Sequence, residues 1–208
     1  IMDNLVNILA SCIGSLTNPN KLAHTFASNG MGHISDKTIS SYISYLMDAF
    51  LISKAERYDV KGKKYIASPY KYYFTDIGLR NARLNFRQQE ETHIMENIIY
   101  NELLIRGFNV DVGIVEHMEK DPVGKRTLKK YEVDFVCNRG NQRYYIQSAF
   151  SISDKEKETQ EQRSLLYTGD FFKKIIVVRD NIIPWHNENG ILIVGLKEFL
   201  LKENSLEL

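Results

Sequence analysis

The sequence predicts a mixed α/β (α+β) protein built from two domains, residues 1–84 and residues 90–208. Three observations predict this class. Apolar residues recur at helical spacing up to residue 50, two β-like runs follow to residue 76, and from residue 93 a helical stretch leads into alternating apolar runs typical of strands. The polar segment RNARLNFRQQEE lies between these parts and is expected to connect the domains.

The composition is that of an ordinary globular chain. Of 208 residues, 43% are hydrophobic, and 27 Lys and Arg against 26 Asp and Glu give a net charge of +1. This charge excludes a global field that attracts nucleic acid or an anionic membrane, so any basic surface is local. Two cysteines, Cys12 and Cys137, are too few for a disulfide framework. Two cysteines are compatible with a reducing cytosol, and no apolar stretch approaches the ~20 residues of a membrane span, so we expect a cytoplasmic protein. The helix-like sequence directly after Ile1-Met2 suggests a piece of a longer gene product.

The N-terminal part predicts three helices. Residues 4–13 carry apolar side chains at helical spacing, Asn18 caps a second helix that begins at Pro19, and Ser35 caps a third. The third helix has the clearest apolar stripe, which we expect to be core: Ile39, Tyr42, Ile43, Leu46, Met47 and Phe50.

A hairpin is predicted directly after these helices. Residues 51–60 and 64–76 are β-like runs around a basic turn at residues 61–64. Three helices followed by a hairpin predict a winged helix, whose third helix would normally enter a DNA groove. The candidate contacts to nucleic acid are Lys37 and Ser41 on that helix and Lys61, Lys63, Lys64 and Lys71 on the hairpin. The helix face also carries Asp48, so we expect the winged helix to contribute little affinity and favour a packing or protein-contact role.

The second domain is predicted to begin with the helix HIMENIIYNELLIRGF, which ends at Gly107. Glu96 shares its apolar stripe with Ile99, Tyr100 and Leu103, so its carboxylate lies at or near the packed face and needs a partner. A strand over residues 108–117 and a charged loop over residues 119–130 are expected next.

Two carboxylates then occur inside an apolar run. EVDFVC and QRYYIQSA flank the turn residues 138–141 and predict a hairpin. Strand alternation sorts the side chains into two sets. One face is expected to carry Glu132, Asp134, Tyr145, Gln147 and Ala149, and the other Val133, Phe135, Cys137, Tyr144 and Ile146. An ordinary half-solvated sheet also explains acids on one face. The buried thiol of Cys137 is expected to be inert.

A helix acid, a strand acid, and an acid or amide two residues before a lysine form the layout of the PD-(D/E)XK nuclease fold. Residues 93–198 resemble it through HIMENIIYNEL, EVDFV, YYIQSA, QEQRSLLYTGDFFKKIIVV and GILIVGLKEFLL, in that order. With KYYFTDIGLRNARL upstream, the chain resembles the C-terminal part of a family of bacterial and archaeal AAA+ ATPases. In that family a winged helix and a restriction-endonuclease-like domain follow the nucleotide-binding domain. The resemblance implies a mixed central sheet flanked by helices, with Mg²⁺ held by Glu96, Asp134 and Gln147.

The sequence departs from the family at the catalytic positions. Gln147 brings no charge and the lysine position is Ala149. Arg163, on the next predicted helix, is a candidate substitute for the lysine or a partner for a carboxylate. No GxxxxGK[ST] stretch occurs, because Gly124-Lys125-Arg126-Thr127 lacks the first glycine and the order of residues. ATP would therefore act only through an upstream ATPase domain that this chain lacks.

Two function classes stay open. The favoured one is a non-catalytic module of an AAA+ ATPase that contacts nucleic acid or a protein partner and requires no cofactor. The alternative is a Mg²⁺-dependent nuclease acting on DNA or RNA through Glu96, Asp134 and Gln147, with help from Glu132 and Arg163. The missing lysine favours the first.

Overall fold

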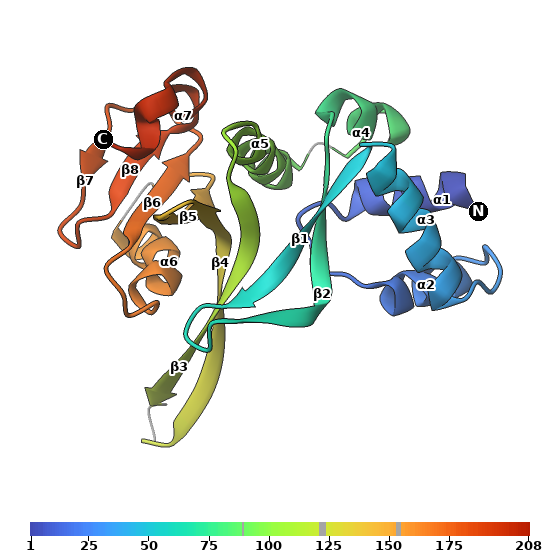
Figure 1. Cartoon of the computed structure of the whole chain (residues 1–208), viewed down its shortest axis with the longest axis horizontal. Coiled ribbons are helices and arrows are strands. Elements are labelled where there is room, and N and C mark those ends of the chain that lie inside the picture. Colours follow the sequence, from blue (N-terminus) through green and yellow to red (C-terminus); the bar gives the residue numbers. More distant parts are fainter. Residues whose placement is uncertain (89, 121–123, 153–154) are drawn as a thin grey trace. The chain divides into compact units, whose positions relative to one another are not determined.

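The computed structural model describes residues 1–88, 90–120, 124–152 and 155–208. The chain is mixed α/β, and its described part contains seven α-helices and an eight-stranded mixed sheet (Figure 1). Two compact units are formed, one from residues 1–56 and 67–101 and the other from residues 57–66 and 102–208. Within the described residues, no helix combines the length and the apolar character that a membrane crossing requires.

The first unit is built on three helices, α1 (Met2–Ser11), α2 (Pro19–Ser28) and α3 (Asp36–Asp48). Both predicted caps are confirmed: Asn18 Oδ1 accepts a hydrogen bond from Lys21 N–H at 2.7 Å, and Ser35 Oγ accepts one from Thr38 N–H at 3.1 Å. The helices enclose one apolar core with the ends of the hairpin strands. The core consists of Leu5, Leu9, Ala10, Ile13, Leu22, Phe26, Ile39, Ile43, Leu46, Ile52, Tyr72 and Phe74.

The predicted stripe of α3 is wrong at its last member. Phe50 lies beyond the helix end, where its backbone has φ 56°, and its side chain is 80% exposed. The helix stops at Asp48, so the periodicity that places Ile39, Ile43 and Leu46 in the core no longer applies two residues later.

The hairpin is confirmed as β1 (Ile52–Asp59) and β2 (Lys64–Phe74). Its middle belongs to the second unit, because residues 57–59 of β1 pair in parallel with residues 112–114 of β3. The sequence predicted a small wing attached to the helices, whereas the hairpin observed here also forms two strands of the large sheet.

The segment predicted as a linker begins inside helix α4 (Ile77–Arg83), whose last four residues are residues 80–83. Arg80 is fully buried, with its Nε donating to Ala10 O at 2.8 Å, so this polar segment packs within the first unit. The predicted domain boundary lies between residues 84 and 90. The structure divides the chain after residues 56, 66 and 101 instead. Helix α5 (Glu91–Ile105) starts in the first unit and ends in the second. Residue 89 of the predicted linker lies outside the described residues.

The second unit contains most of the sheet, whose strands hydrogen-bond in the order β2-β1-β3-β4-β5-β6-β8-β7 (Figure 1). The remaining elements are β3 (Asn109–Lys120), β4 (Arg126–Arg139), β5 (Gln142–Ala149), α6 (Lys155–Leu166), β6 (Lys173–Val178), β7 (Trp185–His186), β8 (Leu192–Gly195), α7 (Leu196–Leu201) and the 3₁₀ turn η1 (Glu203–Leu206). The pairs β3-β4, β4-β5 and β7-β8 are antiparallel, and β1-β3, β5-β6 and β6-β8 are parallel.

The predicted charged loop over residues 119–130 is largely strand. β3 continues to Lys120 and β4 begins at Arg126, and the two strands remain paired out to these residues. Lys129 and Lys130 form ion pairs with Glu119 and Glu116 across the ribbon, at 2.6 and 3.0 Å. Glu119, Lys129 and Lys130, whose charges suggested a loop, are thus members of cross-strand pairs. Residues 121–123 of this segment lie outside the described residues.

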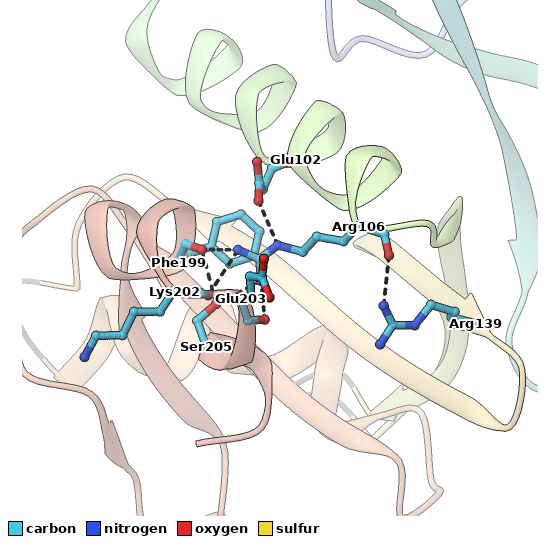
Figure 2. A network of polar contacts seen from close by, with 7 residues as sticks. All are labelled: Glu102, Arg106, Arg139, Phe199, Lys202, Glu203 and Ser205. Carbon is cyan, nitrogen blue, oxygen red and sulfur yellow. Dashed lines mark hydrogen bonds and ion pairs between the residues drawn. The ribbon is translucent and has the colours of Figure 1, made fainter.

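Arg106, just beyond α5, holds the C-terminal helix α7 in place (Figure 2). Its Nε donates to Glu102 Oε1 at 2.8 Å, its Nη1 donates to Ser205 Oγ at 3.0 Å, and its Nη2 donates to the carbonyl of Phe199. The Arg106 carbonyl in turn accepts from Arg139 Nη1 at 2.9 Å. A cavity of about 320 Å³ lies beside this network, but the guanidinium of Arg106 is occupied by groups of the protein itself.

Candidate functional site

Asp134 lies at a β-bulge in strand β4. Asp111 pairs with Val136 and Gly113 with Val133, so one residue of β3, Val112, faces two residues of β4, Asp134 and Phe135. Gly113 permits this arrangement, because a Cβ there would lie 2.7 Å from Val136 Cγ2 and 2.9 Å from Val133 Cβ. Bulges locally unpair a ladder and redirect side chains, and they are frequent next to functional sites.

Asp134 and Gln147 meet across neighbouring strands. The last regular pair of β4 and β5 is Phe135 with Ile146, and beyond it side chains replace the ladder. Asp134 Oδ2 accepts from Ser148 N–H at 2.8 Å, and Gln147 Oε1 lies 3.4 Å from Asp134 N–H. Ser164 on α6 places its hydroxyl 3.3 Å from the same Gln147 oxygen. The two predicted residues are therefore brought together, and their oxygens take part in local hydrogen bonds.

The bulge changes the predicted sorting of side chains. Val133 packs in one apolar cluster with Val136, Tyr145 and Ala149, which also includes Leu165 of α6. The assignment of Val133 to the face opposite Tyr145 is wrong, because the extra residue shifts the alternation by one. By the same shift, Glu132 lies on the face opposite Val133, so the prediction that Glu132 shares the face of Tyr145 is wrong.

Ala149 is 1% exposed within this cluster, beside Leu165. A lysine at this position would bring an ammonium group into apolar surroundings, which is costly without a partner. The small side chain is therefore part of the packing under α6.

Glu96 belongs to the first unit, where its carboxylate is buried and paired. Glu96 Oε1 lies 2.8 Å from Lys71 Nζ and accepts a hydrogen bond from Tyr73 Oη at 2.6 Å. Gly14 gives it room, because a Cβ there would lie 3.0 Å from Glu96 Oε2. Lys71 was predicted to contact phosphate, but it is 3% exposed and forms this buried ion pair. Asp134 and Gln147 belong to the second unit, so the predicted triad divides between the two units.

The structure offers limited means of holding a metal. Over residues 1–88, 90–120, 124–152 and 155–208, no group of three or more His, Cys, Asp or Glu side chains is placed to bind a metal ion. In the second unit the candidate ligands are the carboxylate of Asp134 and the amide of Gln147. Arg163 is exposed on α6, and its charge acts on Glu119, whose pKa is lowered chiefly by hydrogen bonds from Lys129 and Tyr131. A role for Arg163 beside Asp134 stays a prediction.

The predicted nucleic-acid contacts fall into two groups. Lys37 and Ser41 lie exposed on α3 in the first unit, where Ser41 Oγ donates to Lys37 O at 3.1 Å. Lys61, Lys63 and Lys64 lie exposed at the tip of the β1-β2 hairpin, in the second unit. The basic tip is thus part of the unit that contains Asp134.

Sequence reasoning missed the partners of the two acids. Lys71 and Tyr73 are two apart on β2 and therefore share a face, which explains why both reach Glu96. A lysine within the aromatic run YKYYF was an available signal, because a buried lysine requires an acid. The backbone donor at Ser148 had no sequence signal, since it becomes available only because the β4-β5 ladder ends at the pair of Phe135 and Ile146.

Both thiols are poorly nucleophilic. Burial raises the pKa of the Cys12 thiol to about 11, against a small opposing effect of Lys21. Complete burial, with a further contribution from Asp111, raises the pKa of the Cys137 thiol well above its ordinary value. Neither cysteine is therefore a candidate nucleophile.

Comparisons with known proteins give relatives without an assigned activity. Residues 1–90 match a family model described as a domain of unknown function (DUF8612). An uncharacterized protein of Haemophilus influenzae is 34% identical over 97% of this chain and 46% of its own length. The uncharacterized protein MJ1544 of Methanocaldococcus jannaschii is 31% identical over 61% of this chain and 26% of its own length. The chain thus spans about half or less of these relatives.

One solved structure is also similar. The crystal structure of protein VC1899 from Vibrio cholerae aligns with 96% of this chain and 53% of that chain, at 13% identity. Its TM-score of 0.32 is too low to indicate a shared fold.

Proposed function

We propose that this chain is a non-catalytic recognition region of an AAA+ ATPase, which contacts nucleic acid or a protein partner and retains a degenerate nuclease-like site. The proposal combines the sequence resemblance with one structural observation. The oxygens of Asp134 and Gln147 that face the strand gap are engaged by Ser148 N–H, Asp134 N–H and the Ser164 hydroxyl. These contacts give both side chains a structural role at the end of the β4-β5 ladder.

The ligand chemistry supports this reading. Mg²⁺ in phosphoryl-transfer sites is usually held by one or two carboxylates together with waters and substrate oxygens. In the second unit the predicted site supplies one carboxylate, Asp134, while Gln147 adds a neutral amide and Ala149 no cation. Glu96 is already neutralised by Lys71 at 2.8 Å. A site with this composition stabilises charge on a scissile phosphate weakly.

The ATPase part of the proposal concerns a longer protein. The two relatives extend well beyond the region that matches this chain. That additional length provides room for the nucleotide-binding domain that the resemblance implies, whereas this chain has no P-loop motif. ATP hydrolysis is expected from the longer gene product and not from residues 1–208 alone.

A Mg²⁺-dependent nuclease is the second candidate function, and a specific observation favours it. The helix acid that the resemblance implies as a metal ligand, Glu96, is present and buried in the first unit, with Lys71 beside it at 2.8 Å. The bulge at Asp134 is a second feature common near active sites.

A cleavage assay separates the two candidates. We expect the chain to leave plasmid, single-stranded DNA and RNA intact with Mg²⁺ or Mn²⁺, because loss of one preorganised electrostatic group typically costs ~10²- to 10³-fold in rate. Cleavage that disappears in Asp134→Ala would contradict the non-catalytic proposal. In that event, a further loss of cleavage in Arg163→Ala would identify Arg163 as the substitute for the missing lysine.

A further inference from the structure

A second cavity of the second unit lies apart from Asp134 and has a different chemistry. Its volume is about 390 Å³, and three segments form it: the tip of the β1-β2 hairpin, the β4-β5 turn and the loop before β6. It is lined by Tyr58, Val60, Lys63, Asn138, Gly140, Asn141, Gln142, Arg143, Asp170 and Phe172. The lining combines two aromatic rings, two cations and three amides.

The hairpin wall of this cavity is fixed to the sheet. Val60 N–H donates to Ile114 O at 3.0 Å, Lys61 Nζ donates to Glu116 O at 2.8 Å, and Tyr65 Oη donates to Asp111 Oδ2 at 3.1 Å. Together with the parallel pairing of residues 57–59, these bonds hold the tip against β3. The position of Lys63 relative to the β4-β5 turn is therefore set by the fold, so ordering the tip on binding costs little.

Arg143 lies between two aromatic rings. Its Cζ is 5.4 Å from the centroid of Tyr58 and 5.2 Å from that of Phe172, and its Nε donates to Asn138 Oδ1 at 2.7 Å. Of the residues that the structure describes, none forms an ion pair with Arg143 or with Lys63. Asp170 also lines the cavity, but its carboxylate accepts from Tyr145 Oη at 2.6 Å and lies 3.6 Å from Lys174 Nζ.

This arrangement differs from the other arginine network of the unit. The guanidinium of Arg106 donates hydrogen bonds to Glu102, Ser205 and backbone carbonyls, as Figure 2 shows. Arg143 is oriented by an amide and two rings, and its positive charge is not balanced by an acid of the described chain. A cation that is positioned but not neutralised is suited to an external anion such as phosphate.

Exposed aromatic rings extend the site along the surface. Phe172 is 43% exposed and Phe171 is fully exposed. A neighbouring cavity of about 490 Å³ shares Phe172 and Asp170 with the first and adds Phe171, Lys173 and Lys174. Adjacent exposed rings of this kind mark interaction surfaces, and rings alternating with cations are typical of surfaces that bind single-stranded nucleic acid.

We infer that this surface binds a segment of single-stranded nucleic acid, with phosphate at Arg143 and Lys63 and unpaired bases against Phe172 and Phe171. Phosphate requires cations, and an unpaired base requires a flat apolar face, whereas the bases of a duplex are already stacked on each other. The amides of Asn138, Asn141 and Gln142 line the same cavity and are groups that can hydrogen-bond to the polar edge of a base. This inference rests on the recognition role proposed above and assigns that role to the second unit.

The test is a fluorescence-anisotropy titration of the full chain with labelled 12-nucleotide dT, dA and U strands and a duplex of matched length. We expect the single strands to bind more tightly than the duplex. Phe172→Ala should weaken single-strand binding about tenfold or more, in line with measured losses of stacked aromatic rings. Lys63→Gln should weaken it less and lower the dependence on salt by about one phosphate contact.

Matched control variants separate the site from general effects. Phe50→Ala removes a ring of the first unit that is more exposed than Phe172 (80% against 43%), and Lys197→Gln removes an exposed charge from α7. Both should bind like the unmodified chain, and circular dichroism should show that all four variants are folded.

Three results would overturn the inference: no binding of any single strand at 100 mM salt, equal affinity for the duplex, or unchanged affinity in both Phe172→Ala and Lys63→Gln. None of these depends on cleavage. If the chain binds no single strand and also cleaves neither DNA nor RNA, the proposed recognition region would contact a protein partner instead of nucleic acid. Cleavage in that assay would instead reject the proposed non-catalytic function.

Discussion

The two units each bury one acid of the predicted site, and they stabilise it by different means. Glu96 and Asp134 are both 8% exposed. In the first unit, Glu96 is paired with the ammonium of Lys71 and the hydroxyl of Tyr73. In the second unit, Asp134 accepts a backbone N–H from Ser148, which is available because the β4-β5 ladder ends there. One acid is stabilised by an opposite charge and the other by peptide dipoles.

This difference shows that the buried fraction of an acid does not indicate which partner stabilises its charge. An ion pair between buried groups depends on both partners, because removing one leaves a charge in a medium of low dielectric constant. A single hydrogen bond to the backbone contributes less and can be replaced in part by a neutral acceptor. The two acids should therefore respond differently to substitution.

The largest effect is expected from Lys71→Met. This change removes the cation beside the carboxylate of Glu96 and should lower the free energy of unfolding by about 3–5 kcal/mol, measured by urea denaturation. The matched control is Lys54→Met, because Lys54 pairs with Glu56 within strand β1 at 28% and 42% side-chain exposure. That change should cost less than about 1 kcal/mol. Equal losses of unfolding free energy in the two variants would show that the buried Lys71–Glu96 pair stabilises the chain no more than the exposed Lys54–Glu56 pair.

The cysteines provide a separate reporter for each unit. The pKa of the Cys12 thiol rises from 9.0 to about 11, so the thiolate fraction at pH 8 is smaller in the folded than in the unfolded chain. Two pKa units correspond to roughly a hundredfold slower reaction with a disulfide reagent. Cys137 is completely buried and should react only after unfolding.

In Lys71→Met, Cys12 of the first unit should become reactive at a lower urea concentration than Cys137 of the second unit. Reaction is followed as the absorbance of the released thiolate, and labelled peptides are assigned by mass spectrometry. Reaction of both thiols at the same urea concentration would show that the two units unfold together. The two acids would then stabilise one cooperative structure and not two separate units.

A smaller effect is expected from Asp134→Ala, which removes the acceptor for Ser148 N–H. The loss should be about 1.5–3 kcal/mol, the range for a hydrogen bond to a charged group. Asp134→Asn keeps an oxygen at the same place and should retain more than half of this stability in the same urea experiment. A loss in Asp134→Asn as large as that in Asp134→Ala would show that the negative charge, and not the acceptor, stabilises the bulge.

The helices were predictable because their signals are local. The caps at Asn18 and Ser35 act within three residues, and the stripe of α3 depends on a spacing of three and four residues. The stripe of α5 likewise indicated that Glu96 is buried. The β4-β5 hairpin followed from its turn residues, and the structure has Arg139 paired with Gln142 around a two-residue loop.

The sequence by itself determined the helices, the two hairpins and the burial of Glu96, whereas the tertiary structure decided what each acid contacts. Lys71 meets Glu96 across 25 residues, and the bulge at Asp134 arises because Gly113 of β3 allows Val133 and Val136 to approach. The basic tip of residues 61–64 joins the second unit through the pairing of β1 with β3. These features depend on contacts between strands that are far apart in the sequence. A short sequence pattern does not indicate which two strands will pair.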